Sequence, residues 1–256
     1  APCFAIVGSR NATAQGESNA ETFAETLSNS GLVIVSGLAL GIDAAAHRGG
    51  LAGAASTIAV LGTGVDIAYP RRNAELAKAI AARGLLLSEL PLGAAPAAHN
   101  FPRRNRLISG LARGCLIVEA ALASGSLITA RVAAEQGREV FAIPGSIHSP
   151  LSKGCHALIK SGAKLVESAD DVLSELSGFR PSGYASTTAP EPATNSGHGT
   201  LLAHMGHDPV DVDALCLRAG MSAEQVSSEL LRLELAGQVA ALPGGLYQRL
   251  EKGQRR

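Results

Sequence analysis

Short apolar runs alternate with longer amphipathic segments over the first 177 residues of the chain. The apolar runs predict β-strands at 4–7, 32–36, 57–61, 85–87, 115–118, 140–143 and 164–166. The segments between them predict helices near 17–29, 42–53, 72–83, 104–112, 127–137, 154–161 and 169–176. Uniformly apolar strands joined by helices are typical of a parallel sheet covered on both faces. The pattern therefore predicts an α/β domain over residues 1–177 with a Rossmann-like parallel sheet.

The pattern changes after residue 177. Residues 178–199 are rich in Pro, Ser, Thr, Ala and Gly and show no hydrophobic period, which predicts a flexible linker. Residues 200–256 predict short helices near 200–206, 211–218 and 222–236, and a closing hairpin that turns at Pro243-Gly244-Gly245. Three helices followed by a hairpin are typical of a small C-terminal winged-helix domain.

Composition narrows the possible class of protein. Hydrophobic residues make up 46% of the 256 residues but aromatic residues only 3%, so the core is built from Ala, Leu, Val and Ile. Four widely separated cysteines lack metal-type spacing and predict reduced thiols in a cytoplasmic protein. We see no apolar run of membrane-spanning length and no signal peptide. Because the chain begins with Ala1 and not with Met, we expect an N-terminal portion to be missing.

Glycine-containing turns follow several of the predicted strands, at the sheet edge where ligands of such folds bind. After the first strand, Gly8-Ser9-Arg10 suits a phosphate held by Ser9, Arg10 and backbone amides at a helix N-terminus, with a plain tight turn as the alternative. Gly125-Ser126 predicts a second anion site at the start of the helix near 127–137. Neither the dinucleotide pattern GxGxxG nor a P-loop occurs in the chain.

A local basic segment runs from His99 to Arg113 and reads HNFPRRNRLISGLAR. No acidic residue occurs between Leu90 and Val118, although the formal net charge of the whole chain is zero. Arginine side chains match phosphate oxygens in a bidentate way, and Phe101 adds a ring on which a base can stack. This mixture favours single-stranded nucleic acid. The alternative is a solvated basic helix start with a buried Phe.

Other loops carry weaker signals. Arg71 and Arg72 extend the basic surface or are simply solvated, and Lys153 adds a basic contact before a further predicted helix. Asp43 suits a helix cap and His47 suits an exposed helix face, and a catalytic pair of the two is the alternative. No nucleophile lies near them in the sequence to support such a pair.

Catalysis and metal binding have limited support. In an enzymatic interpretation Glu119, at a strand end, is the best candidate for acid–base chemistry. The histidines that suggest a metal, His198, His204 and His207, fall across the linker and a short helix. They have no acidic or cysteine partner to complete a ligand set, so we expect no metal.

The predicted winged helix is poorly equipped to bind DNA. Residues 179–256 contain seven Lys and Arg against eight Asp and Glu. The predicted recognition helix has Arg232 as its one basic residue against three glutamates. Because neutralisation of phosphates dominates non-specific DNA affinity, a protein-interaction or regulatory role is favoured for this domain.

Six ordered segments resemble the DNA-processing protein A (Smf) family: GSR, SGLALGIDAAAH, VLGTGVDIAYPRRN, FPRRNRLISGLA, EAALASGSLITA and FAIPG. The resemblance covers nearly all of residues 4–176, and the tail is similar to the winged helix at the C-terminus of many members. It implies a non-enzymatic protein without cofactor that binds and protects incoming single-stranded DNA in natural transformation. The family also implies loading of a RecA-type recombinase and a homodimer formed through the Rossmann-like domain.

Carried onto this chain, the resemblance and the basic pattern predict a DNA- and phosphate-binding set. Its members are Gly8, Ser9, Arg10, Gly37, Arg71, Asn73, Phe101, Arg103, Arg104, Asn105, Arg106, Gly125, Ser126 and Lys153. In this set Phe101 is the expected base-stacking platform.

An enzymatic alternative stays open at this point. Nucleotide-cleaving enzymes of the lysine-decarboxylase-like Rossmann group are similar in layout, and their glycine-rich motif lies where Glu119 and Gly125-Ser126 fall. Their pattern PGGxGTxxE is absent, because the run here reads SGSLITARVAAE. Release of adenine from adenosine monophosphate would distinguish the two functions.

Overall fold

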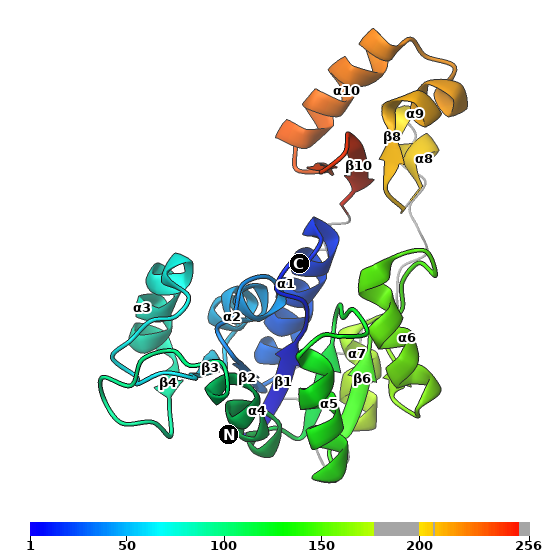
Figure 1. Ribbon diagram of the computed structural model, residues 1–256. Helices are drawn as coiled ribbons and strands as arrows, with labels where there is room; N and C mark the ends of the chain where they lie inside the picture. The colour runs from blue at the N-terminus through cyan, green and yellow to red at the C-terminus, as the bar shows by residue number, and fades with distance from the viewer. Residues whose placement is uncertain (177–199, 207, 251–256) are drawn as a thin grey trace. The chain divides into compact units, whose positions relative to one another are not determined.

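The computed structural model describes residues 1–176, 200–206 and 208–250 (Figure 1). The chain divides into two compact units, Ala1–Tyr184 and Ala185–Arg256. The linker predicted at 178–199 lies outside the described residues, and so do His198 and His207. The two units are described separately below.

The first unit is built on a seven-stranded sheet in which every pair of neighbouring strands is parallel. The strands are β1 (Cys3–Val7), β2 (Val33–Ser36), β3 (Thr57–Val60), β4 (Leu85–Leu87), β5 (Gly114–Ile117), β6 (Glu139–Ala142) and β7 (Lys164–Leu165). Their order across the sheet is β4-β3-β2-β1-β5-β6-β7. This arrangement confirms the predicted Rossmann-like class.

Seven α-helices alternate with these strands in the described part of the first unit. They are α1 (Ala14–Asn29), α2 (Ile42–Ala52), α3 (Ala74–Arg83), α4 (Asn100–Leu111), α5 (Ser126–Glu135), α6 (Lys153–Lys160) and α7 (Ala169–Glu175). Two 3-10 turns, η1 (Arg71–Asn73) and η2 (Pro150–Ser152), precede α3 and α6. The segments agree with the predicted ones to within a few residues at their ends.

The central strand β1 shows why the strands read as continuous apolar runs. Its residues alternate between two buried clusters, Phe4 and Ile6 in one, Ala5 and Val7 in the other. The first cluster includes side chains of α1, α2 and α7, and the second includes side chains of α4, α5 and α6. Both faces of β1 are therefore covered, and neither requires a polar side chain.

From β1 the chain builds the sheet outwards through β2, β3 and β4, and then crosses to the other side of β1 to form β5. At this switch point the amide of Ser9 donates a hydrogen bond to the carbonyl of Glu119 at 2.7 Å, which joins the ends of β1 and β5. A Cβ atom on Gly8 would lie 2.7 Å from Cγ1 of Ile42, so glycine is required there by close packing. Ligands of open α/β sheets bind beyond this edge.

The second unit is a winged helix, as the sequence predicts. It contains α8 (Thr200–Met205), β8 (Val210–Asp211), α9 (Val212–Ala219), α10 (Ala223–Leu235), β9 (Val239–Leu242) and β10 (Leu246–Arg249). The predicted hairpin is present, and Gly244 and Gly245 at its turn both have positive φ angles. The sequence pattern missed β8, which pairs with β10 through two residues only. No described helix is long and apolar enough to cross a bilayer.

Candidate functional site

A cavity of about 430 Å³ lies at the carboxyl edge of the first sheet, beside the switch point. Seven of the predicted binding residues line it: Gly8, Arg10, Phe101, Arg104, Asn105, Gly125 and Ser126. The other predicted residues do not line it: Ser9, Gly37, Arg71, Asn73, Arg103, Arg106 and Lys153. The predicted set thus divides into a cavity group and a surrounding group.

Two aromatic rings and one cation form a wall of the cavity. The guanidinium carbon of the exposed Arg10 lies 5.9 Å from the centre of the Phe101 ring. The ring of Tyr69 lies 5.5 Å from that of Phe101, centre to centre, with 33° between their planes. A Cβ atom on Gly62 would lie 2.8 Å from Cδ1 of Phe101, so the ring packs directly on glycine backbone.

Tyr69 was absent from the predicted set, although it is 44% exposed and lines the cavity. The prediction for the same segment concerned the charges of Arg71 and Arg72 and gave Tyr69 no role. The rarity of aromatic residues, only 3% of the chain, was the signal that could have identified it.

Arg104 is buried rather than presented on the surface, with 6% of its area exposed. Its Nη1 donates to the carbonyl oxygen of Gly37 at 2.6 Å and also to that of Val60. These bonds tie the segments that follow β2 and end β3. Burial lowers the pKa of Arg104, and the nearby carboxylate of Asp43 opposes that effect. Gly37 contributes backbone to this contact and leaves no room for a Cβ atom.

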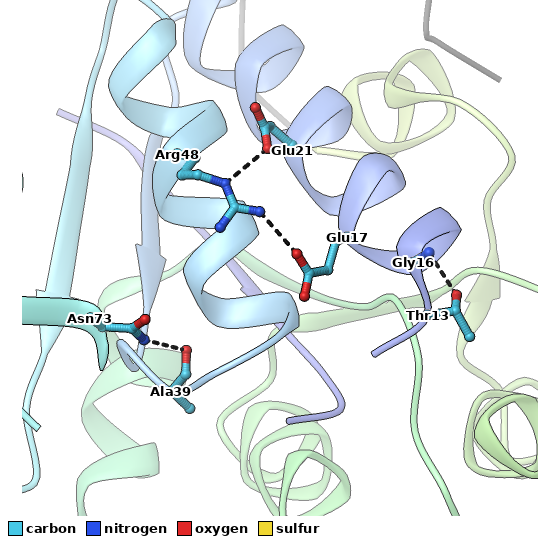
Figure 2. Close-up of polar contacts among 7 residues, drawn as sticks. All are labelled: Thr13, Gly16, Glu17, Glu21, Ala39, Arg48 and Asn73. Atoms are coloured by element: carbon cyan, nitrogen blue, oxygen red, sulfur yellow. Dashed lines mark hydrogen bonds and ion pairs between the residues drawn. The ribbon is translucent and has the colours of Figure 1, made fainter. Parts of the chain in front are cut away.

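Side chains from α2 and η1 hold the turn that follows β2. Asp43 accepts hydrogen bonds at Oδ2 from the amides of Gly37 and Ala39, at 3.1 and 3.4 Å. The Nδ2 atom of Asn73 donates to the carbonyl of Leu38 at 2.9 Å and to that of Ala39 at 3.0 Å; Figure 2 shows the bond to Ala39. Leu38 has a φ angle of +59°, a conformation unfavourable for its branched side chain. The buried amide of Asn73, expected to contact DNA, is thus engaged by the protein itself.

His47 is fully buried, which excludes the alternative of an exposed helix face. Its Nε2 accepts from the amide of Leu38 at 3.3 Å, and its Nδ1 lies 2.7 Å from Oγ1 of Thr57. Because that hydroxyl donates to the carbonyl of Ile34, it accepts from Nδ1–H, which fixes the neutral tautomer. Burial, together with the charge of Arg104, lowers the pKa of His47 to about 3.

The carboxylate of Glu119, the candidate for acid–base chemistry, holds the start of α1. Its carboxylate accepts from the amide of Thr13 at 2.9 Å and from its hydroxyl at 2.6 Å. Thr13 in turn accepts from the amide of Gly16 at 2.9 Å and caps the helix (Figure 2). Burial raises the pKa of Glu119, and the hydrogen bonds from Thr13 oppose the shift. Glu119 does not line the cavity.

The serines of the two glycine turns are engaged within those turns. The Ser9 hydroxyl accepts from the amide of Asn11 at 3.1 Å. At the start of α5 the amide of Ser126 donates to Oγ of Ser124 at 3.3 Å. The amide of Leu127 donates to the carbonyl of Ser124 at 3.2 Å. Of the amides expected to hold an anion, those of Ser9 and Ser126 are therefore already used by hydrogen bonds within the protein.

The surrounding arginines are exposed and partly paired. Nε of Arg103 lies 3.4 Å from Oε1 of Glu89, and Arg106 donates to the other oxygen of that carboxylate. Such exposed pairs contribute about 0–1 kcal/mol and can give way to another anion. Arg71 and Lys153 are exposed at the starts of η1 and α6.

Potential metal ligands are dispersed in the described part of the chain. No group of three or more His, Cys, Asp or Glu side chains gathers among the described residues. The cysteines are free thiols: Cys3, Cys115, Cys155 and Cys216.

Comparison with known proteins adds to this geometry. The family described as DNA recombination-mediator protein A matches residues 1–177, and the DprA winged helix domain matches residues 185–245. Protein Smf of Escherichia coli is 46% identical over 261 residues, which cover 97% of this chain and 68% of that protein. DNA processing protein DprA of Streptococcus pneumoniae is 53% identical over 174 residues, which cover 68% of this chain and 61% of that protein.

Solved structures are similar as well. The X-ray structure of DNA processing protein A from Streptococcus pneumoniae has a TM-score of 0.65 at 52% identity, covering 68% of this chain and 62% of that chain. DNA processing protein A from Helicobacter pylori, whose structure is described for its single-stranded DNA binding mode, has a TM-score of 0.64 at 32% identity. That similarity covers 68% of this chain and 80% of the Helicobacter chain.

Proposed function

Because the chain belongs to the DNA recombination-mediator protein A family, we propose that it binds single-stranded DNA at the cavity of its first unit. In this proposal it protects incoming DNA and loads a RecA-type recombinase onto it during natural transformation and recombination. It acts by binding and carries out no chemical reaction on the DNA. The family match over residues 1–177 and the description of the Helicobacter protein support this function.

One observation carries the proposal: the Arg10 guanidinium stands beside the Phe101 ring at the cavity. A cation next to an exposed aromatic surface suits a strand that offers both phosphates and unpaired base faces. A duplex hides its base faces by stacking, so the same wall favours single strands.

We assign two kinds of role to the predicted binding residues. Direct contact with DNA is assigned to the cavity group apart from Arg104, with Arg10 at the phosphates and Phe101 at a base. The exposed cations outside the cavity, Arg71, Arg103, Arg106 and Lys153, are assigned to the backbone of the strand beyond it. Ser9, Gly37, Asn73 and Arg104 shape the site through the protein contacts described above.

The remaining partners belong to the same proposal. We propose a cytoplasmic homodimer that meets the recombinase through its protein surface. For the winged helix, α10 carries Glu224, Glu229 and Glu234 against Arg232, which favours contact with a protein over contact with DNA.

Nucleotide cleavage is less well supported than binding. The carboxylate that such an enzyme needs would be Glu119, and it is held by Thr13 outside the cavity. Incubation with adenosine monophosphate and measurement of free adenine tests this alternative. Release of adenine by the purified protein would overturn the binding-only function.

Fluorescence anisotropy with labelled oligonucleotides tests the main proposal. We expect tight binding to a single strand, weaker binding to the matching duplex and a steep loss of affinity with added salt. Arg10→Ala should lower the affinity for single strands about tenfold. Arg83→Ala is the matched control. Arg83 ends α3 immediately before β4, so it lies at the amino edge of the parallel sheet, whereas the cavity lies at the carboxyl edge. Equal affinities of the two variants would contradict the assignment of the site.

A further inference from the structure

One residue holds both ends of the short segment that carries Arg10. The backbone carbonyl of Glu119 accepts a hydrogen bond from the amide of Ser9 at 2.7 Å. Its carboxylate accepts from the amide of Thr13 at 2.9 Å and from the Thr13 hydroxyl at 2.6 Å. Arg10 lies in the sequence between these two anchors and is exposed. The point from which Arg10 reaches into solvent is therefore fixed by a residue just beyond the end of β5.

The packing around the Glu119 carboxylate leaves it little freedom to move. A Cβ atom on Gly16 would collide with that carboxylate, so the first turn of α1 closes directly over it. Thr13 caps the same turn, because its hydroxyl oxygen accepts from the amide of Gly16 at 2.9 Å (Figure 2). A negative charge at the N-terminus of a helix is also favoured by the helix dipole. The start of α1 and the segment before it are thus held as one piece by Glu119.

Arg10 stands where its own charge does not favour it. Burial lowers the pKa of Arg104, the carboxylate of Asp43 opposes that effect, and the charge of Arg10 lowers the pKa further. The guanidinium groups of Arg10 and Arg104 therefore repel each other. The Phe101 ring, 5.9 Å from the guanidinium carbon of Arg10, attracts it only weakly at an exposed site. Backbone anchors on both sides of Arg10 keep it beside the ring despite this repulsion.

We propose that Glu119 is a positioning residue for DNA binding, which keeps Arg10 at the phosphates of the strand by holding Thr13. Glu119 does not line the cavity, so it acts through Arg10 and not by contact with DNA. The inference rests on the proposed function, because it takes the ligand of Arg10 to be single-stranded DNA. It also gives the carboxylate an effect opposite to that of its charge, since a negative charge near phosphates by itself lowers the affinity for DNA.

Glu119→Gln separates positioning from charge by the sign of its effect. Thr13 offers two donors and the glutamine side chain has one acceptor oxygen, so one bond is lost while the backbone bond to Ser9 stays. We expect the affinity for labelled oligo-deoxythymidylate, measured by fluorescence anisotropy, to fall about fivefold. Removal of a repelling charge alone would raise the affinity. An equal or higher affinity of the variant would overturn the inference and leave the proposed function intact.

Thr13→Val removes the other side of the same contact without changing any charge. Loss of the hydroxyl should also lower the affinity about fivefold, whereas Thr13→Ser keeps the hydroxyl and should bind like the wild-type protein. Ser168→Ala is the matched control for loss of a helix cap, because Ser168 caps α7 in the same unit and does not line the cavity. Its affinity should equal that of the wild-type protein. A similar loss in Ser168→Ala, or in Thr13→Ser, would overturn the inference.

Combination with Arg10→Ala shows whether the effect passes through Arg10. In that background Glu119→Gln should cause no further loss of affinity, because no guanidinium is left to position. A cation that meets a phosphate of a single strand contributes about 0.7 to the salt dependence of binding, so Glu119→Gln should lower that dependence towards the value of Arg10→Ala. An equal loss from Glu119→Gln in both backgrounds would overturn the inference.

Two further results decide between the inference and the proposed function. Failure of the wild-type protein to bind the oligonucleotide would overturn the proposed function. Wild-type affinity of Arg10→Ala would overturn the inference together with the assignment of Arg10 to the phosphates. Urea unfolding of each variant shows that it is folded. If Glu119→Gln does not fold, Thr13→Val and Thr13→Ser in the presence and absence of Arg10 decide in its place.

Discussion

Arg104 donates a hydrogen bond from Nη1 to the carbonyl oxygen of Gly37, a residue 67 positions away in the sequence. The same nitrogen donates to Val60, and the whole side chain is buried next to Asp43. Although Arg104 belongs to a basic segment that reads as exposed, its side chain joins the carboxyl ends of the neighbouring strands β2 and β3 by hydrogen bonds.

Arg104→Ala should destabilise the protein before it affects DNA. Removing the cation leaves the buried Asp43 carboxylate without its nearby positive charge and two carbonyls without a donor, which costs about 3 kcal/mol or more. Urea unfolding monitored by circular dichroism measures this loss. Arg10→Ala is the comparison, because Arg10 is exposed and its loss should change stability by less than about 0.5 kcal/mol. A normal unfolding midpoint for Arg104→Ala would contradict the bridging role.

Glu89→Gln should strengthen binding to single-stranded DNA. The carboxylate of Glu89 pairs with both Arg103 and Arg106, so its neutralisation frees two cations for phosphates. We expect a gain of roughly twofold to fivefold at low salt, which shrinks as salt is added. Glu135→Gln makes the same change of charge at the far end of α5 and should leave affinity unchanged. An unchanged affinity for Glu89→Gln would mean that these arginines do not meet the strand.

A pair of glycine variants tests the support of the Phe101 ring. A Cβ atom at Gly62 would lie 2.8 Å from Cδ1 of Phe101, whereas at Gly110, which lies within α4, the nearest atom would be 3.7 Å away. Gly62→Ala should displace the ring and lower the affinity for single strands several-fold, at a cost of about 1–3 kcal/mol in stability. Gly110→Ala should keep the affinity and gain up to about 1 kcal/mol, because alanine favours a helix. Anisotropy and urea unfolding measure both effects, and equal affinities would contradict the packing argument.

The fold was predictable because its signals are local. An apolar run such as that of β1 reads as a strand wherever it lies, and the carboxyl edge of the sheet follows from strand and helix order. Burial of charged groups is not local. Arg104 and His47 are buried by contacts with residues distant in the sequence, and nothing in their immediate neighbours signals it. Glu89 was missed for a related reason, since it stands just before the acid-free segment whose charge it offsets.

Buried His47 should make the protein sensitive to acid. Its pKa is about 3 in the folded protein and 6.5 in a free side chain, so the unfolded chain takes up a proton below pH 6.5 while the folded chain does not. The stabilisation is therefore complete above pH 6.5 and is lost as the pH falls towards 3, by about 1.4 kcal/mol for each pH unit. Burial raises the pKa of Asp43, which acts in the opposite direction, because the folded state then binds its proton more readily than the unfolded state.

Comparison with His47→Gln isolates the histidine, because Asp43 is present in both proteins. At pH 7.5 the variant should be less stable by about 1–2 kcal/mol, since glutamine replaces the bonds to Leu38 and Thr57 imperfectly. By pH 4.5 the wild-type protein should have lost about 3 kcal/mol that the variant does not lose, so the order of stability reverses. Urea unfolding at a series of pH values measures both curves. A constant difference between the two proteins across this range would show that His47 is not held neutral by the bonds to Leu38 and Thr57.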